Sequence, residues 1–223
     1  MAEKVLFCWS SGKDSAMALY ELLHDPGYEV VALLTTITAD YDRISMHGVR
    51  RVLVEQQAEL IGLPLEKVLL NKDATNAIYE AQISEALLRY KSQGVTKVGF
   101  GDIFLEDLRE YRENNLAQVG LEAVFPLWQR DTIELADTFI KRGFQAVVTC
   151  VDTQFLPAAF AGRCFDWDFI KALPAGIDPC GENGEFHSFT YAGPIFREPI
   201  EHQLGEIVLR ENRFCFCDVV PEK

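Results

Sequence analysis

A short polar segment, Ser10-Ser11-Gly12-Lys13-Asp14-Ser15, combines residue types that bind phosphate. It follows the apolar run 4–9 and precedes apolar residues at helical spacing, so it is predicted to join a buried strand to a helix. The start of that helix would present unpaired N–H groups and a partial positive charge, to which the Lys13 ammonium adds a donor. We therefore predict a phosphate site in this segment. The alternative is a helix that Ser11 or Asp14 caps without any ligand.

The type of phosphate loop follows from the spacing. A P-loop needs GxxxxGK followed by Ser or Thr, whereas here Asp14 follows Lys13 and only one glycine is present. The segment resembles instead the pyrophosphate loop, SGGxDS in outline, of the N-type ATP pyrophosphatases, which split ATP between its α and β phosphates. Ser11 stands where that loop often has glycine. The resemblance implies ATP on residues 10–15, with Asp14 engaging Mg²⁺ or orienting the loop.

Two further polar positions follow predicted strands. Thr35 and Thr36 end the second strand, where their backbone could read an adenine edge, and Gly101-Asp102 ends the fourth. Ligands of parallel sheets lie beyond the carboxyl ends of the strands, so we expect Thr35, Thr36 and Gly101 to contact the nucleotide. Asp102 is predicted to hold Mg²⁺ or to position the α-phosphate as a catalytic group. Capping of the next helix is an equally weighted alternative.

More of the chain resembles one family, the diphthine–ammonia ligases. The segments that carry the resemblance are WSSGKDS at 9–15, MHGVR at 46–50, GDIFLEDLREYR at 101–112, FPLW at 125–128 and GENGEFHSF at 181–189. The resemblance implies an ATP-dependent amidation, in which a carboxylate attacks the α-phosphate, pyrophosphate leaves and ammonia displaces AMP. It implies diphthine on elongation factor 2 as the acceptor if the chain is archaeal or eukaryotic.

The segment GENGEFHSF has a matching chemical pattern. Gly181 and Gly184 bracket Glu182 and Asn183 in a predicted tight turn, which the family match assigns to substrate binding. An extended 185–190 would place Glu185 and His187 on one face and Phe186 on the other. A carboxylate and an imidazole so paired could orient ammonia or accept its proton, which makes both catalytic candidates. Spacing alone favours a hairpin with a surface ion pair.

Other polar residues near the predicted strand ends have open roles. His47 is predicted to contact substrate or phosphate, with a neutral capping role as the alternative. At least one of Arg43, Arg50 and Arg51, which follow the second strand, is expected to bring positive charge to ATP. Arg109 and Arg112, one turn apart on the helix after Asp102, either face the cleft as well or belong to a salt-bridged helix surface.

The elements that must position these residues alternate along the first half. Apolar runs at 4–9, 29–36, 67–70 and 97–101, separated by helical periodicities, predict a parallel, Rossmann-like α/β sheet of the adenine nucleotide alpha hydrolase type. A last strand at 122–128 closes a predicted ATP-binding domain of residues 1–128. Residues 129–223 are predicted to form a smaller α+β lobe for the substrate, with a helix at 131–142, a strand at 145–151 and a hairpin of 205–210 and 213–220 that turns at Glu211 and Asn212.

Composition narrows the function further. The chain has 223 residues, 48% apolar and 25% charged, and a net charge of −13 that repels nucleic acids and anionic membranes. It shows no signal peptide or membrane span, so we expect a cytoplasmic enzyme, with a homodimer left open. Six cysteines without CxxC spacing indicate reduced thiols. A tRNA-modifying enzyme and a nucleotide-binding module without catalysis are the alternatives, the first opposed by the charge and the second by the acidic segment of the second lobe.

Overall fold

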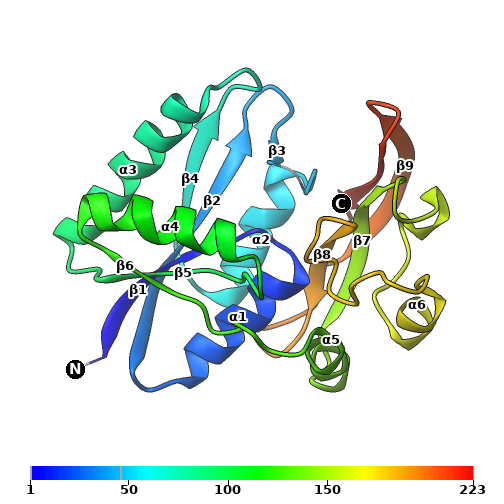
Figure 1. Ribbon diagram of the computed structural model, residues 1–223, viewed down its shortest axis with the longest axis horizontal. Helices are drawn as coiled ribbons and strands as arrows, with labels where there is room; N and C mark the ends of the chain where they lie inside the picture. The colour runs from blue at the N-terminus through cyan, green and yellow to red at the C-terminus, as the bar shows by residue number, and fades with distance from the viewer. Residues whose placement is uncertain (1, 46, 223) are drawn as a thin grey trace.

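The computed structural model describes residues 2–45 and 47–222, which form two β-sheets and the helices packed on them (Figure 1). Met46, the first residue of the MHGVR segment, lies outside the described residues. No helix in the described ranges is long and apolar enough to cross a membrane. The first half contains β1 (Glu3–Cys8), α1 (Lys13–His24), β2 (Tyr28–Thr38), β3 (Arg43–Ile44), α2 (Arg51–Ile61), β4 (Leu65–Leu70), α3 (Asn76–Ser92), β5 (Lys97–Gly99), α4 (Glu106–Val119) and β6 (Glu122–Val124). The second half contains α5 (Thr132–Lys141), β7 (Gln145–Asp152), the 3₁₀ helix η1 (Ala158–Phe160), α6 (Trp167–Ala172), β8 (Phe186–Ala192), β9 (His202–Arg210) and β10 (Phe214–Pro221).

The first sheet confirms the predicted parallel α/β architecture. Its parallel strands run in the order β4, β2, β1, β5, β6, and the short β3 pairs antiparallel with the end of β2. The chain builds outward from β1 in both directions, so a crevice forms at the carboxyl ends of β1 and its neighbours. The predicted strand 122–128 is shorter than expected, because β6 ends at Val124 and Pro126 already lies in a turn.

The second sheet is antiparallel, as the predicted α+β lobe requires, with the order β8, β7, β10, β9. Its hairpin turns at the predicted residues: Glu211 and Asn212 have φ angles of 53° and 51°. The turn is one residue longer than expected. Arg213 closes it by donating its N–H to the carbonyl of Arg210, and β10 begins at Phe214.

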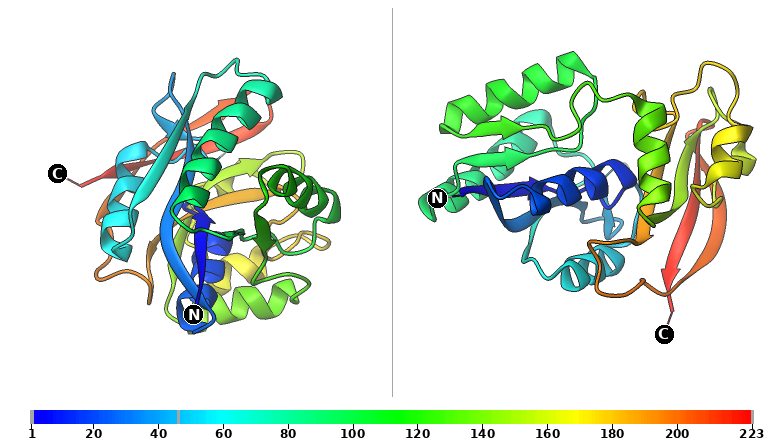
Figure 2. Two further views of the ribbon diagram at one scale, coloured as in Figure 1. Left: turned by 90° about the vertical axis from the view of Figure 1, so that its left-hand side faces the viewer. Right: turned by 90° about the horizontal axis from the view of Figure 1, so that it is seen from below.

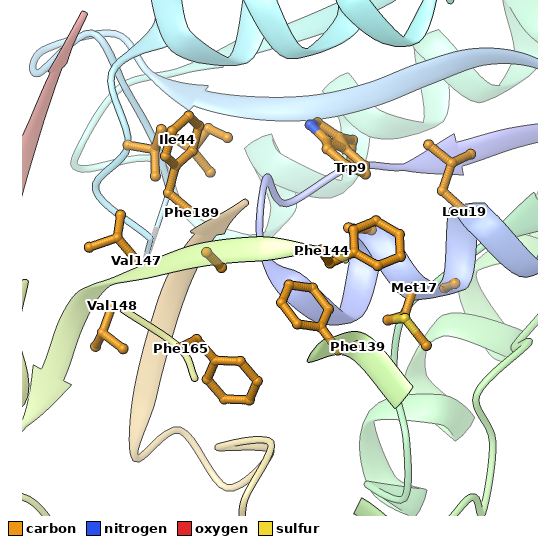
Figure 3. Close-up of a cluster of buried hydrophobic side chains, with 14 of the residues drawn as sticks. Trp9, Met17, Leu19, Ile44, Phe139, Phe144, Val147, Val148, Phe165 and Phe189 are labelled. Carbon is orange, nitrogen blue, oxygen red and sulfur yellow. The ribbon is translucent and has the colours of Figure 1, made fainter. Parts of the chain in front are cut away.

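The two sheets share a single hydrophobic core. In that cluster Trp9 and Leu19 of the first half lie with Val147 and Phe189 of the second, all buried (Figure 3). Helix α5 packs where the sheets meet (Figure 2), and its Phe139 belongs to the same cluster. A second cluster joins α3 and α4 to the opposite face of the first sheet. The predicted lobes therefore pack as one body.

Candidate functional site

A cavity of about 670 Å³ opens at the carboxyl ends of β1, β2 and β5, with walls from both sheets. Thirteen of the fifteen site residues expected from the sequence line it, and Ser11 and Glu185 do not. The lining members are Ser10, Gly12, Lys13, Asp14, Ser15, Thr35, Thr36, His47, Gly101, Asp102, Glu182, Asn183 and His187.

The loop before α1 has a special backbone at Ser11. This residue is fully buried with a φ of 70°, a conformation that glycine adopts without strain and serine does not. Its carbonyl oxygen accepts hydrogen bonds from the N–H of Thr190, at 2.9 Å, and from Nε2 of Gln57, at 3.1 Å. These two contacts fix the direction of the Ser11 carbonyl, and the next two N–H groups, of Gly12 and Lys13, donate to Oγ of Ser10 and Oγ of Ser188.

Helix α1 begins at Lys13, and the residue at its N-cap position, Gly12, has no side chain with which to cap it. The alternative of a helix capped by Ser11 or Asp14 is therefore not what the structure shows. The N–H of Lys13 donates to Oγ of Ser188 in β8, at 3.1 Å. A side chain at Gly12 would place its Cβ 3.2 Å from both the His47 ring and the Ser188 carbonyl, so only glycine fits this crossing without a shift.

Lys13 and Asp14 form an ion pair at the cavity wall. The ammonium donates to both carboxylate oxygens, at 2.6 and 2.7 Å, and lies 5.6 Å from the centres of the Phe165 and Phe186 rings. Burial opposes the charge of Lys13, but Asp14 outweighs it and raises the pKa of the lysine. Lys13 is thus a buried cation beside the loop.

Gly101 and Asp102 bring the end of β5 against the loop. A Cβ on Gly101 would lie 2.9 Å from the Ser15 nitrogen, so the backbones touch here and a side chain cannot fit. Asp102 pairs with Arg112 of α4, with 2.7 Å between Oδ2 and Nε, and the guanidinium stacks on Phe100 at 4.4 Å. Asp102 does not cap α4, which begins after Leu105.

Two histidines flank Gly12 on the side of the second sheet. The rings of His47 and His187 lie 4.5 Å apart at an angle of 34°. Burial lowers the pKa of His187 to about 4 and lowers the pKa of His47 well below its usual range, so both rings are neutral at pH 7. Nδ1 of His47 is buried, and no described group pairs with it. The pair offers nitrogen lone pairs or N–H groups to a ligand.

In the segment from Asp178 to His187, the expectation that Glu185 and His187 share one face is wrong. Glu182 reaches the cavity, where its Oε1 accepts from the N–H of Ile103 at 2.7 Å, and burial with the nearby Asp14 raises its pKa to about 7. Glu185 points into its own loop, where Oε1 accepts from Asp178 N–H and from the amide of Asn183. Glu185 and His187 therefore do not face the cavity together. Phe186, expected on the other face, also lines it.

The expectation that an arginine after the second strand brings positive charge to the cavity is wrong. Arg43 and Arg50 both bind Asp218 of β10, and Arg51 pairs with Asp42, so none of these three lines the cavity. Arg112 does line it. Arg109 follows the surface alternative: it pairs with Glu113 and stacks on Trp128.

Gln57 of α2 is the functional residue that sequence reasoning missed. It is fully buried, and it donates to the carbonyls of Ser11 and Thr190 while accepting from Nε1 of Trp9, at 2.8 Å. One side chain thus ties the loop to both sheets. A signal existed in the sequence, because Gln57 stands four residues after Leu53 and so falls on the apolar stripe of the helix.

The other end of the cavity is apolar. It extends between α3 and α4, along Leu34, Tyr79, Ile83, Leu108 and Tyr111. A polar end with a lysine, an arginine and a helix N-terminus, joined to an apolar arm, suits a ligand with a phosphate at one end and a flat base at the other.

Two of the acidic residues in the cavity, Asp14 and Asp102, are the predicted Mg²⁺ ligands. Within the described residues, no group of three or more His, Cys, Asp or Glu side chains is placed to hold a metal ion. Asp14 and Asp102 line the same cavity, each paired with a cation. This arrangement fits Mg²⁺ only as an ion that arrives with phosphate oxygens, since Mg²⁺ is commonly held by one or two carboxylates together with substrate phosphates.

Known proteins match the chain over nearly its full length. The sequence models described as the diphthamide synthase N-terminal domain and C-terminal domain match residues 3–123 and 131–219. Proteins named diphthine–ammonia ligase are similar: that of Schizosaccharomyces pombe is 28% identical over 96% of this chain, that of Danio rerio 26% over 91%, and that of Homo sapiens 25% over 90%. The chain spans 40% of the first of these proteins, 88% of the second and 83% of the third.

A solved structure also aligns. A Methanocaldococcus jannaschii protein, described as a predicted subunit of tRNA methyltransferase, is 16% identical, with a TM-score of 0.45 over 88% of this chain and all of that one. The α/β fold class follows from the strand order of the chain itself.

Proposed function

The chain belongs to the diphthamide synthase family, and on that premise we propose that it is an ATP-dependent ligase that converts a carboxylate into an amide with ammonia. The observation that carries the proposal is the shared cavity. The loop of residues 10–15 and the segment 181–188, which lie far apart in the sequence, line its polar end together. A ligase of this type must hold ATP and a second substrate in contact.

We place ATP in residues 1–128, with its phosphates on the loop. The N-terminus of α1 and the side chains of Lys13 and Arg112 supply positive charge there, which an anionic ligand needs in a chain of net charge −13. The backbone of Thr35 and Thr36 and the apolar arm between α3 and α4 would receive the adenine. Mg²⁺, brought by the phosphates near Asp14 and Asp102, would neutralise charge on them.

The first chemical step would be activation of the carboxylate. A carboxylate oxygen bonds to the α-phosphorus while the bond from that phosphorus to the bridging oxygen breaks, so pyrophosphate leaves and an acyl-adenylate remains. The donors of the loop favour this step because they face the leaving pyrophosphate as its charge develops. Arg112, held by Asp102 and stacked on Phe100, is oriented before the nucleotide arrives.

The second step would be amide formation. Ammonia attacks the acyl carbon, the bond to the AMP oxygen breaks, and one proton must leave the nitrogen. Glu182 and His187 line the cavity and could accept it; a pKa of about 7 suits Glu182 for that role near neutral pH. Glu185 would act through Asn183, as a positioning residue. Residues 129–223 would bind the acceptor, which for an archaeal or eukaryotic chain would be diphthine on elongation factor 2.

Product analysis tests the reaction class. ATP labelled in the α-phosphate and, in a parallel reaction, in the γ-phosphate, incubated with ammonia and the acceptor, should yield labelled AMP from the first and labelled pyrophosphate from the second, in equal amounts. Recovery of ADP and orthophosphate would defeat the proposal, because the cavity would then direct attack to the γ-phosphate.

Two substitutions separate the halves of the reaction. Lys13→Ala should weaken ATP binding by about 1.5–3 kcal/mol in calorimetry, the cost of one charge-assisted contact. His187→Ala should leave ATP affinity within about twofold and remove amide formation. Lys171→Ala, on the exposed side of α6, is the control and should change neither. Equal effects of the first two variants on ATP affinity would contradict the assignment of His187.

A further inference from the structure

The outer edge of the second sheet is an exposed, partly apolar strand. β9 is the last strand of that sheet, and no strand in the described ranges pairs with its outer side (Figure 1). Leu204, Ile207 and Leu209 are 51%, 56% and 53% exposed. A long open edge of this kind pairs readily with another strand, and proteins usually block such edges with lysine, proline or a covering segment. The nine residues of β9 contain neither lysine nor proline.

The exposed apolar side chains share one face of the sheet. Leu209 lies opposite Cys215 and Ile207 opposite Cys217, and both cysteines are buried. Residues directly opposite each other in an antiparallel pair point to the same face. The apolar face of the sheet therefore continues from β10, where it is buried, to β9, where its side chains are exposed.

The open edge also presents hydrogen-bonding groups. The carbonyl of Arg210 accepts from Arg213 in the hairpin turn, so it points toward β10. Backbone groups alternate in direction along a strand, which turns the N–H and C=O groups of Leu209 and Ile207 outward.

We propose that β9 is the interface of a homodimer, in which it pairs antiparallel with β9 of a second copy about a twofold axis at Val208. Ile207 of one copy then lies opposite Leu209 of the other, and the reverse, so four apolar side chains meet on one face. Their outward N–H and C=O groups form the hydrogen-bonded pairs on either side of the axis. The two sheets become one continuous sheet.

The charged side chains of β9 favour this register of strand pairing and a second copy of the chain as the partner. With the axis at Val208, Glu206 of each copy lies opposite Arg210 of the other on the second face. Both side chains are exposed, and neither forms an ion pair within the described part of the chain. An axis at Ile207 instead would set Leu204 opposite Arg210 and Glu206 opposite Val208. The strand is thus complementary to itself in one register, as a twofold interface requires.

Cross-linking tests the register. Two Val208 Cα atoms that face each other across the axis would lie about 4.5 Å apart, within the range that a disulfide spans. In a Cys164→Ser background, which removes the exposed native thiol, Val208→Cys should form a disulfide-linked dimer under mild oxidation. Glu206→Cys is the matched control: the two copies of residue 206 would be four residues apart along the strands, about 13 Å, and should not cross-link.

Charge reversal tests the partner in solution. Glu206→Arg and Arg210→Glu, each alone, create two like-charge contacts per dimer and should raise the dimer Kd at least about tenfold in sedimentation analysis. The double reversal restores both contacts and should restore the Kd. Glu59→Arg, an exposed substitution on α2 with the same charge change, should leave it unchanged.

Each other outcome overturns the proposal. If the chain stayed monomeric at about 100 μM, the homodimer would be ruled out, and the open edge of β9 would instead be available to a strand of a different protein. A dimer that tolerates the single reversals, or that cross-links equally at 206 and 208, would use another surface or another register.

Discussion

Replacement of Gln57 by leucine would remove the side chain that ties the phosphate loop to both sheets. Leucine has a similar volume and no polar atoms, so the substitution takes away three buried hydrogen bonds and leaves little empty space. Ser11 keeps one partner for its carbonyl, the N–H of Thr190. Nε1 of Trp9 loses its hydrogen-bond acceptor, and the carbonyl of Thr190 loses the side-chain donor that Gln57 supplied.

The expected cost follows from these two buried groups. A buried donor or acceptor without a partner costs about 1–3 kcal/mol, so the loss of partners for two such groups should lower the free energy of unfolding of Gln57→Leu by about 2–6 kcal/mol. Folded domains are stable by about 5–15 kcal/mol, so the variant should still fold. ATP affinity should fall about fivefold, because part of the strain at Ser11 would have to be restored on binding, at a cost of about 1 kcal/mol.

Urea unfolding followed by tryptophan fluorescence measures the first quantity, and calorimetry with ATP the second. Gln56→Leu is the matched control: it is the neighbouring glutamine, and its Oε1 is buried without a partner among the described residues. It should be neutral or stabilising. If Gln57→Leu changed the unfolding free energy by less than about 1 kcal/mol, the buried network would not be what holds the loop.

Three further substitutions probe the site and its supports. Ser11→Gly should raise the unfolding free energy by about 1 kcal/mol, since it relieves the left-handed backbone; destabilisation in urea unfolding would contradict this. Burial alone would raise the pKa of Asp218, but Arg50 and Arg43 lower it to about 2, so the carboxylate stabilises the fold above its unfolded pKa of 3.8 and this contribution is lost as the pH falls toward 2. Asp218→Asn should therefore cost about 1–2 kcal/mol at pH 7 after allowance for screening and much less near pH 2, as compared by unfolding at both pH values. Burial raises the pKa of Glu182 from 4.5 to about 7, so the wild-type chain should lose about 1–2 kcal/mol relative to Glu182→Gln as the pH rises from 5 to 8, and parallel stability profiles would count against a buried, ionising Glu182.

Local sequence patterns predicted the elements of the fold well. The strands of the first sheet and the helix of residues 132–141 follow from apolar runs and periodicity, which record how each residue meets its own neighbours. The position of the loop of residues 10–15 was predictable for the same reason: its six residues are contiguous, and the strand and the helix beside it fix where it lies.

Long-range contacts explain what the patterns missed. Asp218 lies 175 residues from Arg43 and 168 from Arg50, so their engagement could not be read from the spacing near the second strand. Strand alternation predicted Glu185 on the same face as His187. Glu185 precedes β8, however, and its carboxylate accepts a hydrogen bond from the N–H of Asp178 in the preceding loop. A regular period holds only inside the element that generates it.

The hydrogen bond from Lys13 to Ser188 sets an order of events during synthesis. Its two residues are 175 positions apart, and Thr190, which binds the Ser11 carbonyl, emerges later still. Residues 3–124 can leave the ribosome and pair as a sheet before either contact exists. Until β8 emerges, the loop lacks the partners that hold Ser11 and the first turn of α1. The first half of the nascent chain could therefore be folded while the proposed nucleotide site is still incomplete, and that site would form only after β8, which ends at Ala192, has emerged.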